Sequence, residues 1–262
     1  MEHNRNSKKN SEIKIRRCES LDELDACVKL QKEVFALPDL EVSPRRHLVV
    51  TISAGGFVLG AFAAERLVGF VLSVPGFLRN ENFFYSHMTA VAEDFQSLGV
   101  GAKLKWAQRE QSLKENVKFI KWTFQPFQAR NAFFNLEKLG AIIKSYAPNF
   151  YGTDYSNSRG QNERIGLDSD RLFAEWHLEN EKVTALSKGK EFVEKADVAA
   201  TIEISNEWND LVKLNPRKAV AEQSRVKDEF QKAFAQNLIC KGFHRDDEKP
   251  KYLLYAGNNN NF

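Results

Sequence analysis

The residues best suited to chemistry lie between Phe83 and Ala102, where FFYSHMTAVAEDFQSLGVGA has the pattern of an apolar strand, a turn and a helix start. Gln96, Gly99 and Gly101 mark the turn in a Q-x-x-G-x-G spacing. Glycines let backbone N–H groups approach an anion closely, and a helix N-terminus adds free donors and a positive dipole end. The stretch therefore predicts a phosphate-binding turn, although close packing of a helix on a sheet uses the same residue types.

Two common nucleotide-binding motifs do not fit this turn. A dinucleotide-binding fold needs G-x-G-x-x-G and an acidic residue about 20 positions later, and a P-loop needs G-x-x-x-x-G-K-[ST]. The turn has neither the third glycine nor a Lys-Ser/Thr pair. We therefore exclude both kinds of nucleotide site.

The elements before the turn are predicted from hydrophobic spacing and capping residues. Ile13–Arg16 has the pattern of a first strand, and Ser20–Glu23 is a capping box that opens a helix to about Leu37. Gln31 is the polar member of that helix's apolar face. The uncharged run Leu48–Ala64 is too short and too interrupted for a membrane span, and we expect two buried strands that meet at a glycine turn.

Strands and helices then alternate. We expect strands at 55–64 and 67–74 joined by Glu65-Arg66, a strand at 83–91, a helix at 99–116, a strand at 117–124, a helix at 128–139 that ends at Gly140, and strands at 141–146 and 171–178. The residues Arg45 and Arg46 precede a loop or a short helix.

The domain boundaries follow from composition. We predict a disordered tail at 1–12, a first domain at 13–180, a polar linker at 181–196 and a C-terminal extension at 197–262. In the extension we expect a strand at 198–204, a helix that starts at Asn215-Pro216, and strands at 239–244 and 251–255. The fold class is α/β (α+β): a mixed central sheet flanked by helices, with a C-terminal β-α-β-β extension that joins the sheet or forms a small subdomain.

This element order, together with the turn, resembles the GNAT (Gcn5-related N-acetyltransferase) superfamily, in which a Q/R-x-x-G-x-G/A turn is called motif A. The match runs in register from Val91 to Gly101. Further blocks resemble an uncharacterised branch of predicted GNAT acetyltransferases: WTFQPF from Trp122, RNAFFN from Arg130, NFYG from Asn149 and SDR from Ser169. The resemblance is strong over residues 13–180.

The resemblance implies a site for acetyl-CoA as co-substrate. The strand before the turn would pair with the pantetheine arm, with thioester contacts from the backbone near Thr89, Ala90 and Val91. The pyrophosphate would meet the backbone amides of Gln96, Ser97, Leu98, Gly99, Val100, Gly101 and Ala102. Asn131 opens the helical region where the superfamily often places an asparagine near CoA, although the usual register falls on Ala129.

The catalytic groups are harder to assign. His87 is the best candidate for the base, because it stands just before the thioester contacts and an imidazole accepts a proton near neutral pH. The alternative is that His87 has a structural role. Glu175 is a second candidate for the base. The superfamily's usual tyrosine acid falls on Leu136, which leaves Tyr151 or an unassisted thiolate. Gln125 stands where the related branch usually has an aspartate, and a glutamine cannot act as a base.

Composition narrows the function class. The net charge of +3 and the absence of a dense basic face argue against nucleic-acid binding, and three cysteines without a C-x-x-C pair predict a cytoplasmic protein without disulfides or metal. We expect an N-acetyltransferase that acts on a small amine, as a monomer or homodimer, with no membrane partner. A longer acyl group, or a non-catalytic module that binds CoA or a partner, are the alternatives.

Overall fold

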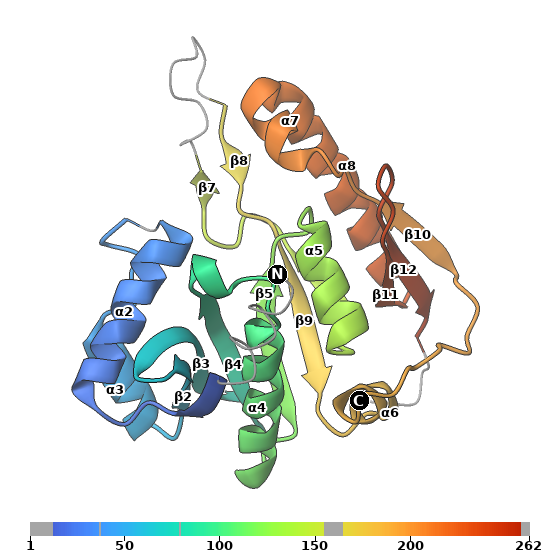
Figure 1. Cartoon of the computed structure of the whole chain (residues 1–262). Coiled ribbons are helices and arrows are strands. Elements are labelled where there is room, and N and C mark those ends of the chain that lie inside the picture. Colours follow the sequence, from blue (N-terminus) through green and yellow to red (C-terminus); the bar gives the residue numbers. More distant parts are fainter. Residues whose placement is uncertain (1–12, 37, 79, 155–164, 258–262) are drawn as a thin grey trace, which may run out of the picture. The chain divides into compact units, whose positions relative to one another are not determined.

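The computed structural model describes residues 13–36, 38–78, 80–154 and 165–257, so the tail predicted at 1–12 and the end of the extension at 258–262 lie outside the described residues. The chain forms two compact units, Met1–Lys121 and Trp122–Phe262. Both units contain helices and strands (Figure 1), which confirms the predicted mixed α/β class. Within the described residues, no helix combines the length and the apolar character that crossing a membrane requires.

The first unit is built on antiparallel strands and one parallel pair. Its strands lie in the order β1-β2-β3-β4-β5, and the pair β4–β5 is parallel. The elements are β1 (Ile13–Arg17), α2 (Leu21–Phe35), α3 (Arg45–Ser53), β2 (Phe57–Ala63), β3 (Arg66–Leu78), β4 (Glu81–Val91), a 3-10 turn (Glu93–Phe95), α4 (Val100–Lys114) and β5 (Phe119–Phe124), whose last residues belong to the second unit.

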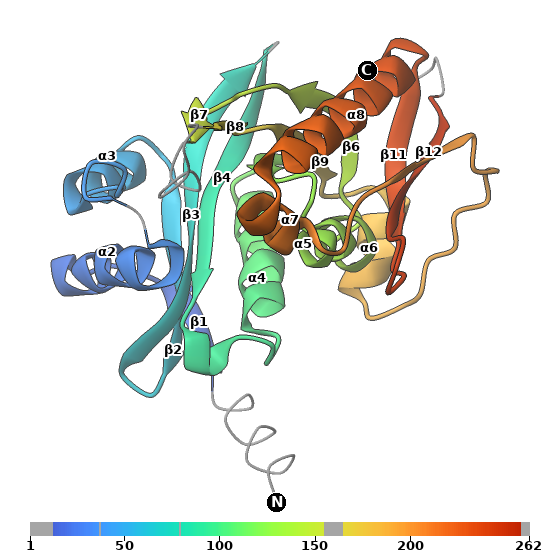
Figure 2. The same cartoon turned by 90° about the horizontal axis from the view of Figure 1, so that it is seen from above.

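Helices cover both faces of these strands. Figure 2 shows α2 and α3 on one side of β3 and α4 on the other, and all three helices contact β3. The capping box predicted for α2 is confirmed: Ser20 Oγ accepts from the backbone of Glu23, and the Glu23 carboxylate accepts from the backbone of Ser20. The middle of β3 is completely buried between these layers, as Val68, Phe70, Val71 and Leu72 show.

Three predictions for this unit are wrong in detail. The first half of the run Leu48–Ala64 is helix α3, because Leu48 and Thr51 bury one helical face and the chain turns only at Gly55, with a φ of +92°. The next hairpin turns at Ala64-Glu65, with Ala63 paired to Arg66. The third strand extends to Leu78 instead of ending at Val74.

The larger set of paired strands in the second unit has five antiparallel members in the order β9-β6-β11-β12-β10, and β7 and β8 form a separate antiparallel pair. Its elements are α5 (Ala129–Phe133), a π-helical turn (Phe134–Lys138), β6 (Ile142–Ala147), β7 (Thr153–Asp154), β8 (Leu167–Asp168), β9 (Arg171–His177), α6 (Glu181–Ser187), β10 (Ala200–Glu203), α7 (Trp208–Leu214), α8 (Pro216–Ala235), β11 (Leu238–His244) and β12 (Lys251–Ala256). Helix α8 contacts β6, β10 and β11.

The C-terminal extension joins this sheet, because Cys240 of β11 pairs with Ile143 of β6. The core here is aromatic: the Phe230 ring of α8 lies edge-on to Tyr252 at 5.0 Å. The sequence missed the hairpin β7–β8 and helix α7, and helix α6 occupies part of the predicted linker. The single helix expected at 128–139 divides into α5 and the π-helical turn.

Candidate functional site

One edge of β4 is open beside the predicted cofactor turn. β4 pairs with β3 along its whole length, from Glu81 to Val91. Among the described residues, its parallel ladder with β5 covers Phe84 and Tyr85 alone. From Ser86 onward, the edge of β4 that faces away from β3 therefore has no strand partner in the described part of the chain.

Strand alternation determines which backbone groups lie on this edge. Ala92 N–H donates to Val68 O of β3 at 2.9 Å. Both backbone groups of a residue in an antiparallel strand point to the same side, and successive residues alternate. Ala90 therefore bonds toward β3, whereas Thr89 and Val91 present their N–H groups to the open edge.

The turn after β4 is held against that edge. Gln96 Nε2 donates to Val91 O at 3.1 Å, so the glutamine of the Q-x-x-G-x-G pattern occupies a carbonyl of the strand instead of pointing to a ligand. Ser97 and Gly99 both have positive φ, +62° and +80°. Gly99 is the N-cap of α4. The first backbone N–H groups of α4 have no partner within the helix, so the turn can offer them to an anion.

The glycines of this region have different roles. A Cβ on Gly69 would lie 3.0 Å from Ala90 O and 3.1 Å from Leu104 Cδ1, so close packing of α4 on the sheet depends on Gly69. A Cβ on Gly101 would meet only Val91 Cγ2, at 3.9 Å. Packing therefore does not require a glycine at Gly101.

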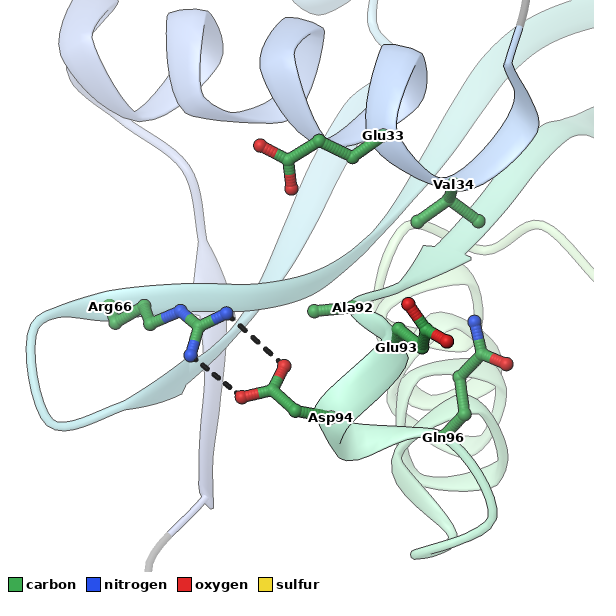
Figure 3. A pocket seen from close by; sticks show the side chains of 7 residues that line it. All are labelled: Glu33, Val34, Arg66, Ala92, Glu93, Asp94 and Gln96. Atoms are coloured by element: carbon green, nitrogen blue, oxygen red, sulfur yellow. Dashed lines mark hydrogen bonds and ion pairs between the residues drawn. The ribbon is translucent and has the colours of Figure 1, made fainter.

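A cavity of about 750 Å³ lies beside the turn, next to Glu93, Asp94 and Gln96 (Figure 3). It is lined by Glu33, Val34, Arg66, Ala92, Glu93, Asp94 and Gln96. Arg66 donates to both carboxylate oxygens of Asp94, at 2.8 and 3.1 Å. The three carboxylates outnumber the single guanidinium, which is itself paired with Asp94, so the cavity repels an anion and is unsuited to a pyrophosphate.

His87 lies at a β-bulge in the middle of β4. Leu72 of β3 pairs with Met88 and Ser73 pairs with Ser86, which leaves His87 as the extra residue. A bulge of this kind redirects a side chain and is common beside active sites. The sequence identified the histidine, but a bulge depends on the partner strand and leaves no signal in a single sequence.

The His87 ring contacts a serine that the sequence did not single out. His87 Nε2 lies 3.2 Å from Ser43 Oγ. Gln31 fixes the backbone of Ser43, because Gln31 Nε2 donates to Ser43 O at 3.1 Å and Ser43 N donates to Gln31 Oε1 at 3.0 Å. The interpretation of Gln31 as an imperfect apolar position is therefore corrected: its side chain is completely buried because Ser43 satisfies it.

The surroundings of His87 favour the neutral imidazole. The His47 ring lies edge-on at 5.8 Å. Loss of water around the His87 ring, followed by the nearby His47, lowers the pKa of His87 below its ordinary value. The lowered pKa favours the neutral form of the ring, and because the His87 residue is exposed, solvent reaches the imidazole.

The other predicted residues lie in the second unit. Asn131 is exposed on α5, whereas Leu136 is completely buried and cannot supply an acid. Tyr151 is exposed, with its hydroxyl 3.4 Å from Thr123 Oγ1. Glu175 forms an ion pair with Lys144, with Oε2 3.5 Å from Nζ, and its Oε2 lies 3.8 Å from His177 Nε2.

Three of the sequence blocks converge within the second unit. Asn149 N donates to Asp170 Oδ1 at 2.8 Å, and Tyr151 N donates to Ser169 Oγ at 2.6 Å. A cavity of about 350 Å³ lies beside them. Its lining includes Gln125, Phe127, Ser169, Asp170, Arg171 and Trp208. Trp208 stacks on Phe127 at 3.7 Å between ring centroids and was missed because α7 was missed.

Comparison with known proteins identifies the fold. No protein-family model matches the chain, and no curated protein matches it in sequence. A protein from Desulfovibrio desulfuricans, described as belonging to the GNAT acetyltransferase family, matches with a TM-score of 0.50 and 13% identity; the match covers 63% of this chain and 99% of that one. The match therefore shows that the two chains share an α/β architecture.

That architecture is the GNAT fold, as the sequence predicted. Two further structures have lower scores. Naa50 from Arabidopsis thaliana, in complex with the bisubstrate analogue CoA-Ac-MVNAL, has a TM-score of 0.49 and 15% identity over 63% of this chain and 97% of that one. An aminoglycoside acetyltransferase from an uncultured soil metagenomic sample has a TM-score of 0.42 and 18% identity over 46% and 83%. The match to the Desulfovibrio desulfuricans protein, at 13% identity, shows the fold and not the substrate.

Proposed function

We propose that this protein is an N-acetyltransferase that moves an acetyl group from acetyl-CoA to a small amine. The observation that carries the proposal is the open edge of β4, which presents the N–H groups of Thr89 and Val91 and leads into the glycine turn. The GNAT fold supports it. A longer acyl donor is an alternative within the same class.

The backbone groups on the open edge of β4 and in the turn support a role in binding acetyl-CoA. The Thr89 and Val91 amides would bind the pantetheine arm, and Ala90 would contribute a small buried side chain beneath it. The amides from Gln96 to Ala102 would bind the pyrophosphate at the start of α4. Bound acetyl-CoA supplies the thioester, so the protein has to orient the acceptor and remove its proton.

We assign the proton acceptor to His87. Its ring would take the proton that the acceptor ammonium must lose before the free amine attacks the thioester, and Ser43 Oγ, 3.2 Å from Nε2, would hold the ring in place. Asn131, which the sequence placed near CoA, is retained as a proposed contact. Acceptors to test include polyamines, aminoglycosides, amino acids and peptide N-termini, with a small amine as our proposal.

The test is acetyl-CoA binding by two variants at one position. Gly101→Ala fits the space around the backbone and should bind acetyl-CoA like the wild type. Gly101→Glu places a carboxylate in the first turn of α4, which favours the helix but repels a pyrophosphate. Ligand at about 100 times Kd adds about 2.7 kcal/mol to the free energy of unfolding, which raises Tm by about 5 to 10 °C.

We expect this shift in the wild type and in Gly101→Ala, and its loss in Gly101→Glu. A folded wild type without any shift, by melting and by calorimetry, would remove the proposal. Binding without turnover of any amine would instead support the alternative of a non-catalytic CoA-binding module. For such a non-catalytic module, His87→Asn should leave the affinity for acetyl-CoA and the shift in Tm unchanged.

A further inference from the structure

Four polar side chains lie on the buried face of the β4 bulge, between the sheet and α4. Lys105 Nζ donates to Ser86 Oγ at 3.0 Å and to Gln108 Oε1 at 2.7 Å. Gln108 Nε2 donates to Ser73 Oγ at 2.7 Å, and Ser86 Oγ donates to Gln108 Oε1 at 3.2 Å. Two residues of α4 therefore hold one serine on each strand.

This cluster is costly to bury. Lys105 is 4% exposed and Gln108 is completely buried, and burial alone lowers the pKa of Lys105 well below its ordinary value. Apolar residues of similar volume at such positions are often neutral or stabilising. A gain in stability therefore does not explain the buried Lys105 amine. A buried polar network can instead favour one packing of the strands and the helix over other packings.

The position of the two serines indicates which arrangement is specified. Ser73 and Ser86 form the cross-strand pair that directly adjoins the bulge, and His87 is the bulged residue. Successive side chains of a strand point to opposite faces. Hydrogen bonds that hold Ser86 against α4 therefore direct His87 to the other face, where its ring meets Ser43.

A slip of the bulge by one residue would reverse this placement. Register shifts of one residue exchange the two faces of a strand. Moving the bulge to Ser86 would turn the Ser86 hydroxyl away from α4. The Lys105 amine and the Gln108 amide would then each lose their hydrogen bond to Ser86 inside the core. The network thus makes the alternative register unfavourable.

We propose that Lys105 and Gln108 are positioning residues for His87, and that they fix the β4 bulge through Ser86 and Ser73. The inference rests on the proposed function insofar as His87 is the proton acceptor. It predicts that the network matters for the geometry of the His87 ring and not for the binding of acetyl-CoA.

The test compares three variants with the wild type by ¹H–¹⁵N NMR of the histidine rings. Lys105→Met fills the same space without hydrogen bonds. Ser86→Ala removes only the Ser86 hydroxyl and its hydrogen bonds to Lys105 and Gln108, which is a smaller change in side-chain volume. The control is Ser112→Ala, because Ser112 is also buried on α4 but donates only to Gln108 O of the helix backbone, at 2.8 Å.

We expect Lys105→Met to keep or raise Tm, to keep acetyl-CoA binding, and to broaden or split the His87 ring signals. Acetyl transfer, once an acceptor is found, should fall about 10²-fold in kcat with KM for acetyl-CoA unchanged. Ser86→Ala should change the His87 signals in the same direction, and Ser112→Ala should leave them unchanged.

Unchanged His87 signals in both Lys105→Met and Ser86→Ala would overturn the inference, as would equal changes in Ser112→Ala. The NMR comparison needs neither ligand nor acceptor. It therefore decides the positioning role even where the wild type fails to bind acetyl-CoA, which would refute the proposed function alone.

Discussion

Replacing Gln31 by leucine removes both hydrogen bonds that fix Ser43 beside His87. The wild-type side chain is completely buried, and it pairs with Ser43 N at 3.0 Å and Ser43 O at 3.1 Å. Each buried backbone group left without a partner costs about 1 to 3 kcal/mol. Leucine regains part of this by burying apolar surface, so the free energy of unfolding should fall by about 2 to 4 kcal/mol.

The assay is urea unfolding followed by circular dichroism, with a thermal scan beside it. The expected fall in Tm is about 5 to 15 °C for a chain of this size. Lys29→Gln, an exposed change on the same helix, is the matched control and should stay within about 0.5 kcal/mol of the wild type. A loss below about 0.5 kcal/mol for Gln31→Leu, with an unchanged m value, would refute the assigned role of these hydrogen bonds.

Three further predictions concern a turn, a pH dependence and two thiols. Gly99→Ala should lower the free energy of unfolding by about 1 to 2 kcal/mol, because Gly99 has a φ of +80°; Gly101→Ala should not, and urea unfolding checks both. Because the pKa of His87 is lowered, His87 should accept a proton above that pKa and lose this ability as the pH falls through it. The acidic limb of the kcat–pH profile should therefore lie below the ordinary histidine pKa of about 6.5. Cys27 should react slowly with Ellman's reagent until the protein unfolds, because the contact with Cys18 at 3.9 Å and burial raise the pKa of its thiol.

The outcomes that would contradict these predictions are distinct. Equal stability losses at both glycines would mean that the turn is sensitive to any side chain. An acidic limb above the ordinary histidine value, or one that survives His87→Asn, would assign the proton acceptor elsewhere. Rapid labelling of Cys27 in the folded protein would show that the contact between Cys18, just after β1, and α2 opens readily.

The sequence predicted the elements that local rules determine. The capping box at Ser20 and Glu23 and the strand that ends at Val91 are readable within a few residues, since caps and alternation are local. Helix α7 was missed because seven residues are too short a window, although Trp208, Leu211 and Val212 follow helical spacing. The strand that starts at Arg66 was cut short because Pro75 and Gly76 normally end strands, whereas here both pair with β4.

The site was predictable in its backbone part and not in its side chains. Glycine spacing indicates a turn that can accept an anion, because that chemistry needs only backbone amides. The contact between His87 and Ser43 joins residues 44 positions apart, and it depends on a bulge that only the pairing with β3 creates. A polar residue such as Gln31 on an apolar helix face is the one sequence signal that could have indicated a buried partner, although the partner itself has no signature.

Under the proposed function, the lack of a tyrosine at position 136 places the chemical demand on the acceptor side of the reaction. Leu136 is completely buried, so a group there cannot protonate a leaving thiolate. A thiol with an ordinary pKa of about 8.5 leaves readily as the thiolate near neutral pH, whereas an ammonium cannot attack until it has lost a proton. If the proposed function is right, removal of the His87 imidazole should therefore slow acetyl transfer more than removal of the Tyr151 hydroxyl. His87→Asn and Tyr151→Phe, compared at one pH with the same amine, measure that difference, and a larger loss in Tyr151→Phe would show that protonation of the thiolate limits the rate.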